Sequence, residues 1–563
     1  MRRYPPDGDR FGPAPLFPPH QALSWLLEAK GAEETRAALR VLNGMALGGV
    51  RDHLGGGFHR YSTDGDWHRP HFEKTLYDNA LLLRAYALAW RASQDEEMKK
   101  TAEEIFEWLE GSMRDPAGGF YSAIDADSEG VEGRYYIWTA EEIRSSLSPE
   151  DARLVIAAYG VTEEGNYREE ATGQATGANV LDPARPLEET AGIVGVPPGD
   201  FRVALDRAQD LLLQRRTERI PPITDDKILT SWNGLAIGSL AVAGQLLERQ
   251  DMVERSRAGA DFILKRMHTD GGLLHAYRQE KAYQAAFLDD YAYLVDGLID
   301  LYEVTEEVRW LEAATRLADE MHRLFQDPAG GAYFVTSPDH DQLFTRFKSP
   351  HDSATPSANG VAARALLRLS RRGAGPRFEQ RARAILQDLS GEMAGQPMAT
   401  LTLMGALTLT QLPLNSASGK PTEGSQLEAS GHHVRLRALA PEPLHPGRTG
   451  TVKLTLEIDK GWHINSHQPY QKSLAPTEVE ARSRENRASV EKPEYPAGKE
   501  RYFSFSGEPM SVYEGVVSLE LPVRAGRTPG KEGAAPAGRG SGGEGSRRSR
   551  GPRPHPEECA DPG

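Results

Sequence analysis

The sequence predicts a mainly α-helical protein of repeated helix pairs, followed by a small β domain. Apolar residues three and four apart dominate residues 20–415, which is the spacing of helices with one buried face. An Asp-Pro-Ala-Gly-Gly turn at residues 115–119 recurs at residues 327–331 and indicates an internal repeat. Beyond residue 430 the pattern changes to the alternation typical of strands, as in residues 452–458.

The spacing of the glycine turns fits one helix pair per repeat. Gly56 and Gly118 are 62 positions apart, and Gly271 and Gly330 are 59 positions apart. Either interval holds two helices with their connections, so an open solenoid and a closed ring fit the period equally well. In a closed ring, the loops at one end share a cavity.

Length and charge limit the classes of protein that fit. A chain of 563 residues exceeds one hydrophobic core, so two or more domains are expected. The net charge of −15 argues against nucleic acid or anionic membrane as partners. No apolar run of about 18 residues and no secretion signal is present, which predicts a cytoplasmic protein. Cys559 is the single cysteine, so no dithiol chemistry within the chain is expected.

The richest candidate for a functional site is the loop at residues 55–79. Three glycines at its start permit tight turns, and imidazole, carboxylate, ammonium and indole groups follow within about two dozen residues. After Pro70 the apolar spacing becomes helical, so the polar residues lie on a loop and the first turn of a buried helix. The alternative is an architectural loop in which Arg60 and Glu73 pair and the histidines cap helix ends.

Acidic and polar residues also stand at later helix starts, beginning at Asp125, Asp225, Asp289 and Asp352. Capping explains many of these positions, because carboxylates satisfy free N–H groups and suit the helix dipole. One carboxylate suffices for a cap, so the second residue of each Asp-Asp pair is expected in a cavity.

Two kinds of chemistry remain open for these residues. Facing carboxylates, one protonated by burial, would allow glycoside hydrolysis. Facing histidines would allow proton abstraction beside a sugar carbonyl, as in epimerases. A metal site is not expected, because Pro70 interrupts the helical spacing of His68 and His71 and no His-Glu-x-x-His pattern is present. Nucleotide-binding glycine motifs are also absent, so no cofactor is predicted.

The loop at residues 55–79 resembles the hallmark of the YyaL-type, spermatogenesis-associated thioredoxin-like family. Residues 11–18, 225–234, 287–292 and 352–359 are similar to further segments of that family, in the same order. The resemblance implies a closed (α/α)6 six-hairpin toroid. It also implies an upstream thioredoxin-like domain with a cysteine motif, which is expected to be missing here.

The β region resembles the N-terminal immunoglobulin-like domain of DsbD thiol:disulfide interchange proteins, on residues 461–466 and 476–479. The reactive cysteine pair implied by that resemblance is absent. After Val523 the sequence becomes rich in Gly, Arg and Pro, which predicts a disordered tail and suggests a lost reading frame near Arg524. The expected boundaries are a toroid at 1–412, a linker at 413–430, a truncated β-sandwich at 431–523 and the tail at 524–563.

The leading hypothesis is a toroid that binds or processes a carbohydrate-type ligand in a central cavity, with glycoside hydrolysis or sugar epimerisation as the candidate reactions. The alternative is a non-catalytic scaffold or chaperone-like module that acts with a thioredoxin-like partner. The candidates for proton transfer are His59, His71, Glu73, Asp78, Asp226 and Asp290. The candidates for ligand binding are Arg60, Tyr61, Trp67, His68, Lys74, Tyr77, Asp125, Lys227, Trp232, Asn233, Tyr291, Asp352 and Asn359.

Overall fold

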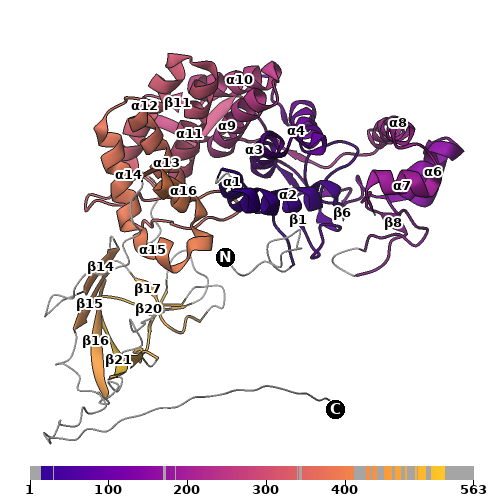
Figure 1. The fold of residues 1–563 in the computed structure, drawn as a ribbon. Coiled ribbons are helices and arrows are strands. Elements are labelled where there is room, and N and C mark those ends of the chain that lie inside the picture. Colours follow the sequence, from indigo (N-terminus) through magenta and orange to yellow (C-terminus); the bar gives the residue numbers. More distant parts are fainter. Residues whose placement is uncertain are drawn as a thin grey trace, which may run out of the picture. The chain divides into compact units, whose positions relative to one another are not determined.

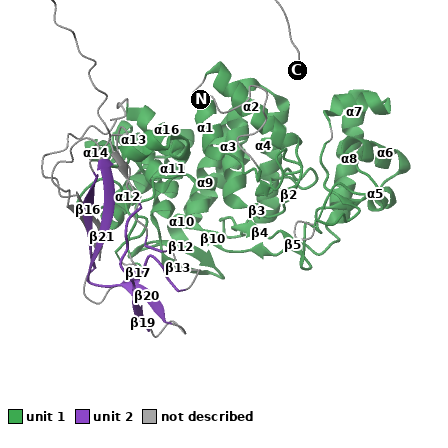
Figure 2. Ribbon diagram, turned by 90° about the horizontal axis from the view of Figure 1, so that it is seen from below, with its two compact units in different colours: residues 1–421 green, residues 422–563 purple. Residues whose placement is uncertain are grey.

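The chain divides into two compact units, residues 1–421 and residues 422–563, which Figure 2 distinguishes by colour. The computed structural model describes residues 14–28, 31–168, 173–183, 185–338, 340, 345–410, 427–431, 434–439, 449–458, 463–470, 476–477, 488–490, 492–502 and 509–525. Within these residues no helix combines the length and the apolar character needed to cross a lipid bilayer.

Six helices of the first unit form a closed inner ring (Figure 1). Each packs on the next in the order α1, α3, α9, α11, α13, α16, and α16 packs back on α1. This contact from last to first distinguishes a toroid from an open solenoid, so the predicted fold class is confirmed. The inner helices are α1 (His20–Glu28), α3 (Leu76–Ser93), α9 (Thr230–Leu246), α11 (Leu288–Thr305), α13 (Ala358–Arg371) and α16 (Leu401–Thr410).

Outer helices alternate with the inner ones along the chain. Each packs on the inner helix before it through one apolar face, as in α12, where Trp310, Leu317 and Met321 are buried. The outer helices are α2 (Ala32–Leu47), α4 (Glu96–Trp108), α10 (Gln250–Arg266), α12 (Val308–Phe325) and α14 (Pro376–Asp388). Shorter turns are η1 (Leu109–Met113), α15 (Ser390–Gly395) and η2 (Pro397–Ala399).

An insertion that the sequence analysis did not separate lies between α4 and α9. Its helices, grouped in purple in Figure 1, bury a hydrophobic cluster of their own. They are α5 (Ala140–Ser146), α6 (Pro149–Ala158), α7 (Leu187–Val194) and α8 (Pro198–Arg216). The signal was available, because the glycine turns at Gly118 and Gly271 are 153 positions apart where one helix pair needs about 60.

Short antiparallel strands lie in the loops between outer and inner helices, and others lie in the segment of the insertion. The pairs are β1 (Tyr61–Ser62) with β2 (Pro70–His71), β5 (Asp127–Ser128) with β6 (Val131–Glu132), and β7 (Trp138–Thr139) with β8 (Ala178–Asn179). A three-stranded sheet holds β3 (Lys74–Thr75), β4 (Ala123–Ile124) and β9 (Thr224–Asp225), and a four-stranded sheet holds β10 (Ile228–Leu229), β11 (His268–Thr269), β12 (Gly272–Arg278) and β13 (Lys281–Ala285).

Three asparagines in the first turns of inner helices hold the glycine turns in place. Each Oδ1 accepts from a backbone N–H at 2.6–2.8 Å, and each Nδ2 donates to the carbonyl of that same residue at 2.9–3.0 Å. The clamped backbone groups belong to the first aromatic residue after the glycines. The pairs are Asn79 with Phe58, Asn233 with Phe120 and Asn359 with Tyr333. The amides of Asn233 and Asn359 are therefore committed to the fold, which corrects their assignment to a ligand.

The turn before Phe58 needs glycine for steric reasons. Gly57 has a φ of 72°, and a Cβ there would lie 2.7 Å from a ring carbon of Trp108. A side chain at this position would therefore strain the backbone and displace the indole.

We expect Asn233→Ala to lower the free energy of unfolding of the ring by on the order of 3 kcal/mol, because buried peptide groups lose their partners. Asn43→Ala is the matched control, since Asn43 is a half-buried residue of α2. Chemical denaturation of both variants checks this, and equal losses in the two would contradict the clamp.

The second unit is built from two antiparallel sheets. Alternate residues Leu454, Leu456 and Ile458 are buried against Leu519 and Leu521, as the strand pattern predicted. The sheets are β14 (Leu427–Gly431), β15 (Val434–Leu439), β16 (Thr449–Ile458), β21 (Val516–Ala525) and β18 (Ala488–Val490), and then β17 (Ile464–Asn465), β20 (Met510–Tyr513) and β19 (Lys499–Arg501).

The first strand, β14, begins at Leu427, inside the segment predicted as linker. Residues 411–426, residues 461–462 and the tail from residue 526, including Cys559, lie outside the described residues.

Candidate functional site

A cavity of about 530 Å³ lies inside the ring and is lined by residues of all six inner helices. We call it the bore. On α11 the lining residues Tyr293, Asp296, Asp300 and Glu303 are three and four apart and form one helical stripe. The bore therefore follows the inner helices from their first turns toward their last.

One end of the bore, which we call the mouth, is formed by the first turns of the inner helices. α3, α11 and α13 follow outer helices, α9 follows the insertion after the outer helix α4, and α16 follows the short η2 turn, so the loops with the glycine turns all arrive at this end. Tyr77 lies four residues before the lining residue Leu81, and Asp289 lies four residues before Tyr293. The helical period therefore places Tyr77 and Asp289 on bore-facing stripes at the mouth.

The paired carboxyls at the mouth have different surroundings. Asp290 is fully buried and accepts from the backbone N–H groups of Ser231 and Phe287, both at 2.8 Å, and from Nδ1 of His275 at 2.9 Å. Asp289 is half-buried, and burial together with the charge of Asp290 raises its pKa to about 7. The prediction assigned the cavity role to Asp290, but Asp290 is the cap and Asp289 is the group available at the mouth.

Aromatic and cationic candidates contact one another at the rim of the mouth. The rings of Tyr77 and Trp232 are edge to face with centroids 4.8 Å apart. The Tyr77 hydroxyl accepts from Nε of Arg60 at 3.2 Å, and Arg60 also pairs with Glu73 at 2.8 Å. Burial above all raises the pKa of Tyr77 to about 12, so the phenol stays protonated at neutral pH.

The remaining loop residues extend this rim. Nδ1 of His71 donates to Glu132 at 2.7 Å, and its Nε2 lies 3.8 Å from Glu73. Tyr61 stacks on His71 with centroids 4.8 Å apart. The predicted pair of Arg60 and Glu73 is present, and it joins these side chains into one polar cluster.

Deeper in the bore, charged side chains from three helices form ion pairs. The sequence analysis did not predict these pairs. Arg84 of α3 lies 2.6 Å from Asp300, while Arg364 and Arg368 of α13 lie 2.6 and 2.8 Å from Asp296. Burial opposes ionisation of Asp296, but Arg364 and Arg368 lower its pKa to about 2. The walls of the bore are thus held together by buried charges.

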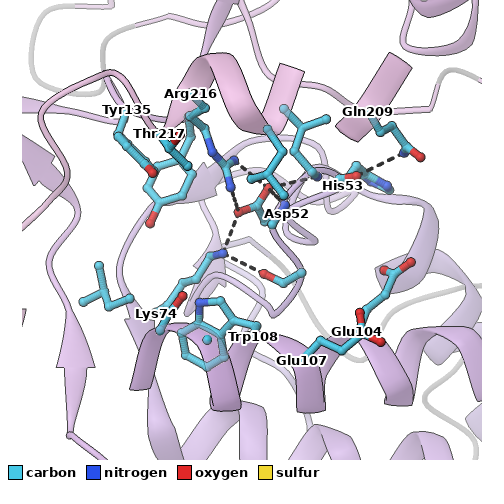
Figure 3. A pocket seen from close by; sticks show the side chains of 18 of the residues that line it. Asp52, His53, Lys74, Glu104, Glu107, Trp108, Tyr135, Gln209, Arg216 and Thr217 are labelled. Atoms are coloured by element: carbon cyan, nitrogen blue, oxygen red, sulfur yellow. Dashed lines mark hydrogen bonds and ion pairs between the residues drawn. The ribbon is translucent and has the colours of Figure 1, made fainter. Parts of the chain in front are cut away.

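A second cavity, of about 720 Å³, lies between α4 and the inserted helix α8 and shares no lining residue with the bore (Figure 3). Asp52 is its hub. Both carboxylate oxygens of Asp52 accept from Arg216, at 2.8 and 2.9 Å, and Lys74 donates to Oδ2 at 2.7 Å. Burial would raise the pKa of Asp52, but Arg216 and Lys74 hold it well below its usual range.

Lys74 belongs to this hub rather than to the mouth, which corrects its predicted role. Its ammonium also donates to the carbonyl of Gly56 at 2.8 Å and lies 5.4 Å from the ring centre of Trp108. Burial lowers the pKa of Lys74 to about 8, although Asp52 opposes the shift. The side chain is 1 % exposed, and its ammonium makes two hydrogen bonds within the protein.

His59 is also buried near the hub. Its Nδ1 donates to the carbonyl of Phe72 at 2.9 Å, and its ring meets those of Phe72 and Tyr136 edge to face. Burial, followed by the charge of Lys74, lowers the pKa of His59 to about 3. The imidazole is therefore neutral in the fold and packed as a core group, not as a proton carrier at the mouth.

Two more candidates are enclosed by the fold. Trp67 is 1 % exposed and cannot stack on a ligand. Tyr291 is also 1 % exposed, and its hydroxyl accepts from the N–H of Leu273 at 2.9 Å.

The other candidates form hydrogen bonds or ion pairs within the protein. Asp352 accepts from the N–H groups of Ser357 and Thr402, at 2.8 and 3.0 Å. Asp226 pairs with Arg278, and Lys227 lies 3.1 Å from Asp225. Exposed Asp125 accepts from the N–H of Ala126 at 2.7 Å.

His68 pairs with Asp182 of the insertion. This pair raises the pKa of His68, mainly through the hydrogen bond. The pair therefore lies at the junction of loop and insertion.

We expect Arg216→Met to destabilise the protein by about 3–5 kcal/mol, because it leaves the buried carboxylate of Asp52 with one fewer cation. Arg215→Met on the same helix is the control: Arg215 and its partner Glu218 are both solvent-exposed, so their pair should be worth under about 1 kcal/mol. Urea unfolding of both variants makes the comparison, and a loss for Arg215→Met as large as for Arg216→Met would refute the hub.

His59 also predicts a pH dependence. The unfolded chain takes up a proton near pH 6.5 and the folded chain near pH 3, so stability is complete above pH 6.5 and falls as the pH drops through this window. The slope from this group reaches roughly 1.4 kcal/mol per pH unit. Denaturation from pH 7 to pH 4 should show a shallower slope for His59→Gln, and parallel curves would disprove the assignment.

The closed ring of helix pairs and the polar mouth define an α/α toroid with a candidate ligand site. Spermatogenesis-associated protein 20 of Homo sapiens is 37% identical over 443 residues, which are 72% of this chain and 56% of that protein. The Mus musculus protein of the same name is 36% identical over 441 residues, again 72% and 56%. The chain is thus a homologue of spermatogenesis-associated protein 20, which confirms the resemblance, and it spans about half the length of the curated relatives it matches.

The second unit and the solved structures give further similarities. Residues 435–535 match the family model of the N-terminal domain of thiol:disulfide interchange protein DsbD. A family 76 glycoside hydrolase from a bovine Bacteroides thetaiotaomicron strain has a TM-score of 0.39 at 11% identity, over 69% of this chain and 68% of that one. A D-mannose isomerase has a TM-score of 0.32 at 12% identity, over 64% and 86%. The toroid is assigned from this chain's own helix packing.

Proposed function

We propose that the mouth of the ring binds a carbohydrate-type small molecule and that Asp289 transfers a proton to or from it. The observation that carries the proposal is Asp289 itself. This carboxyl has a pKa near 7 and stands on the helical stripe that lines an open cavity. A group that titrates near neutral pH can donate and accept protons under working conditions, whereas an ordinary carboxylate cannot donate.

The rim supplies the contacts that a sugar requires. Trp232 is half-buried, and the exposed part of its indole offers an apolar surface on which a pyranose ring can stack, while Tyr77, 4 % exposed, supports the indole edge to face. Arg60, Glu73 and His71 offer polar groups at the same rim. A cavity with an apolar wall and a few placed polar groups is the usual form of a small-molecule site.

The open bore favours this proposal over a purely structural scaffold. A scaffold would fill its centre with its own aromatic side chains, but the ring encloses about 530 Å³ of space. A thioredoxin-like partner remains compatible with the family and with the second unit. Such a partner would bring its own dithiol, because this sequence holds one cysteine.

The test is thermal stabilisation of the full chain by a library of mono- and disaccharides. We expect a saturable rise in Tm for the wild type, which Asp289→Asn and Trp232→Ala reduce at least tenfold in apparent affinity. Asp270→Asn, in an exposed turn, should leave the affinity unchanged. A wild-type Tm that does not move with any sugar would rule out the carbohydrate proposal.

A further inference from the structure

We propose that His20 is a second proton-transfer group of the bore, held by Asp78 and acting from the side of the ring opposite Asp289. The inference rests on the proposed function and assigns its reaction class: proton abstraction beside the carbonyl of a reducing sugar. His20 did not stand out in the sequence, because it opens the first inner helix outside every motif.

The geometry around His20 resembles the positioning of a catalytic imidazole. His20 lines the bore, and its Nε2 lies 2.8 Å from Oδ1 of Asp78. The other oxygen of Asp78 accepts from the hydroxyl of Thr75 at 2.5 Å. Because this carboxylate accepts on both oxygens, Nε2 of His20 carries the hydrogen and Nδ1 keeps its lone pair.

The free nitrogen is the unusual feature. Nδ1 of His20 is buried and has no hydrogen-bond partner among the described residues. A buried nitrogen without a partner is unfavourable, so a purely structural pair would gain by satisfying it. His20 is itself 2 % exposed, but unlike Trp67, Tyr291 and His59 it lines the bore, so a ligand packed against this wall can reach it. An acceptor held in fixed orientation within hydrogen-bond reach of a bound ligand is the arrangement that a general base requires.

The topology of the ring sets His20 against Asp289. From α1, the helix α11 is the third neighbour in either direction, through α3 and α9 or through α16 and α13. His20 is the first residue of α1, and Asp289 is the second residue of α11. The two groups therefore lie at the same end of the bore on opposite walls, where a ligand between them meets a base on one side and an acid on the other.

Other carboxylates near the mouth are already engaged, which argues against hydrolysis by a carboxylate pair. Glu73 pairs with Arg60, Asp226 pairs with Arg278, and Asp290 accepts three hydrogen bonds. His71 at the rim is engaged by Glu132, so of the described groups named here the Asp289 carboxyl and the His20 imidazole remain. This pair suits enolisation better than glycoside hydrolysis, which needs two carboxyls.

The proposed step is balanced without any cofactor. Nδ1 of His20 removes the proton from the carbon beside the carbonyl of the open-chain sugar. The electron pair of that C–H bond forms a C=C bond, and the carbonyl oxygen takes the proton of the Asp289 carboxyl, which gives an enediol. Return of one proton to carbon and of one hydroxyl proton to Asp289 yields an epimer or an aldose–ketose isomer and restores both groups.

Deuterium exchange tests the inference. The full chain is incubated with glucose, mannose, fructose or cellobiose in D2O, and proton NMR follows deuterium incorporation at the carbon beside the carbonyl. We expect exchange with wild type and a loss of at least about 10²-fold in His20→Gln, the range for removal of a general base. The glutamine amide can still donate to Asp78, so this variant is expected to keep the tie between α1 and α3, and its Tm shows whether it folds.

Two further variants separate catalysis from structure. Asp78→Asn keeps the imidazole but not its anionic acceptor, so the pH profile of exchange should shift. His322→Gln is the control, because His322 is a half-buried residue of the outer helix α12 that contacts Tyr333.

Each outcome decides a different question. A sugar-dependent rise in Tm without exchange in the wild type overturns the assignment of His20 and leaves the proposed function standing. Exchange that persists in folded His20→Gln also overturns it. No rise in Tm with any sugar and no exchange overturns both.

Discussion

Closure of the inner ring is the constraint on which the site depends. Because α16 packs back on α1, six helices that are distant in sequence direct their first turns to one end. Any polar group on a bore-facing stripe of those turns must face the others across the mouth. The pairing of α1 with α11 as opposite walls, and hence of His20 with Asp289, follows from this closure and from no local motif.

Many of the buried polar residues stabilise the closed ring and are not part of the candidate site. The repeated glycine turns are fixed by Asn79, Asn233 and Asn359. Their side-chain amides are the hydrogen-bond partners of buried backbone groups. Asp290 has a similar role, since it joins the start of α11 to the start of α9 through Ser231. Buried polar groups of this kind make the register of each hairpin specific.

Helical period and turn repeats were sufficient to predict repeated helix pairs, because the pairs have their own apolar spacing and the first four of the ring end in a glycine turn. The site was harder to predict, because its members are chosen by helical phase. Asp289 and Asp290 are adjacent in sequence, but a rotation of about 100° per residue sends one to the bore and the other to a neighbouring helix. Tyr77, Trp232 and Arg60 were identified by residue type, whereas His20 needed the three-dimensional position of Asp78.

The bore and the cavity around Asp52 have different characters. The space around Asp52 is dominated by enclosed ion pairs that join the insertion to the ring, and its cations are already used. The bore keeps a carboxyl that titrates near neutral pH and an imidazole nitrogen without a partner. This contrast is the physical reason for assigning ligand binding to the bore and a structural role to the hub.

The most direct measurement is a crystal structure of the protein soaked with a reducing sugar that stabilises it. The account predicts electron density for the sugar at the mouth, with its carbonyl end between Asp289 and His20 and its ring against Trp232. Density in the cavity at Lys74 and Arg216, with the bore empty, would contradict it.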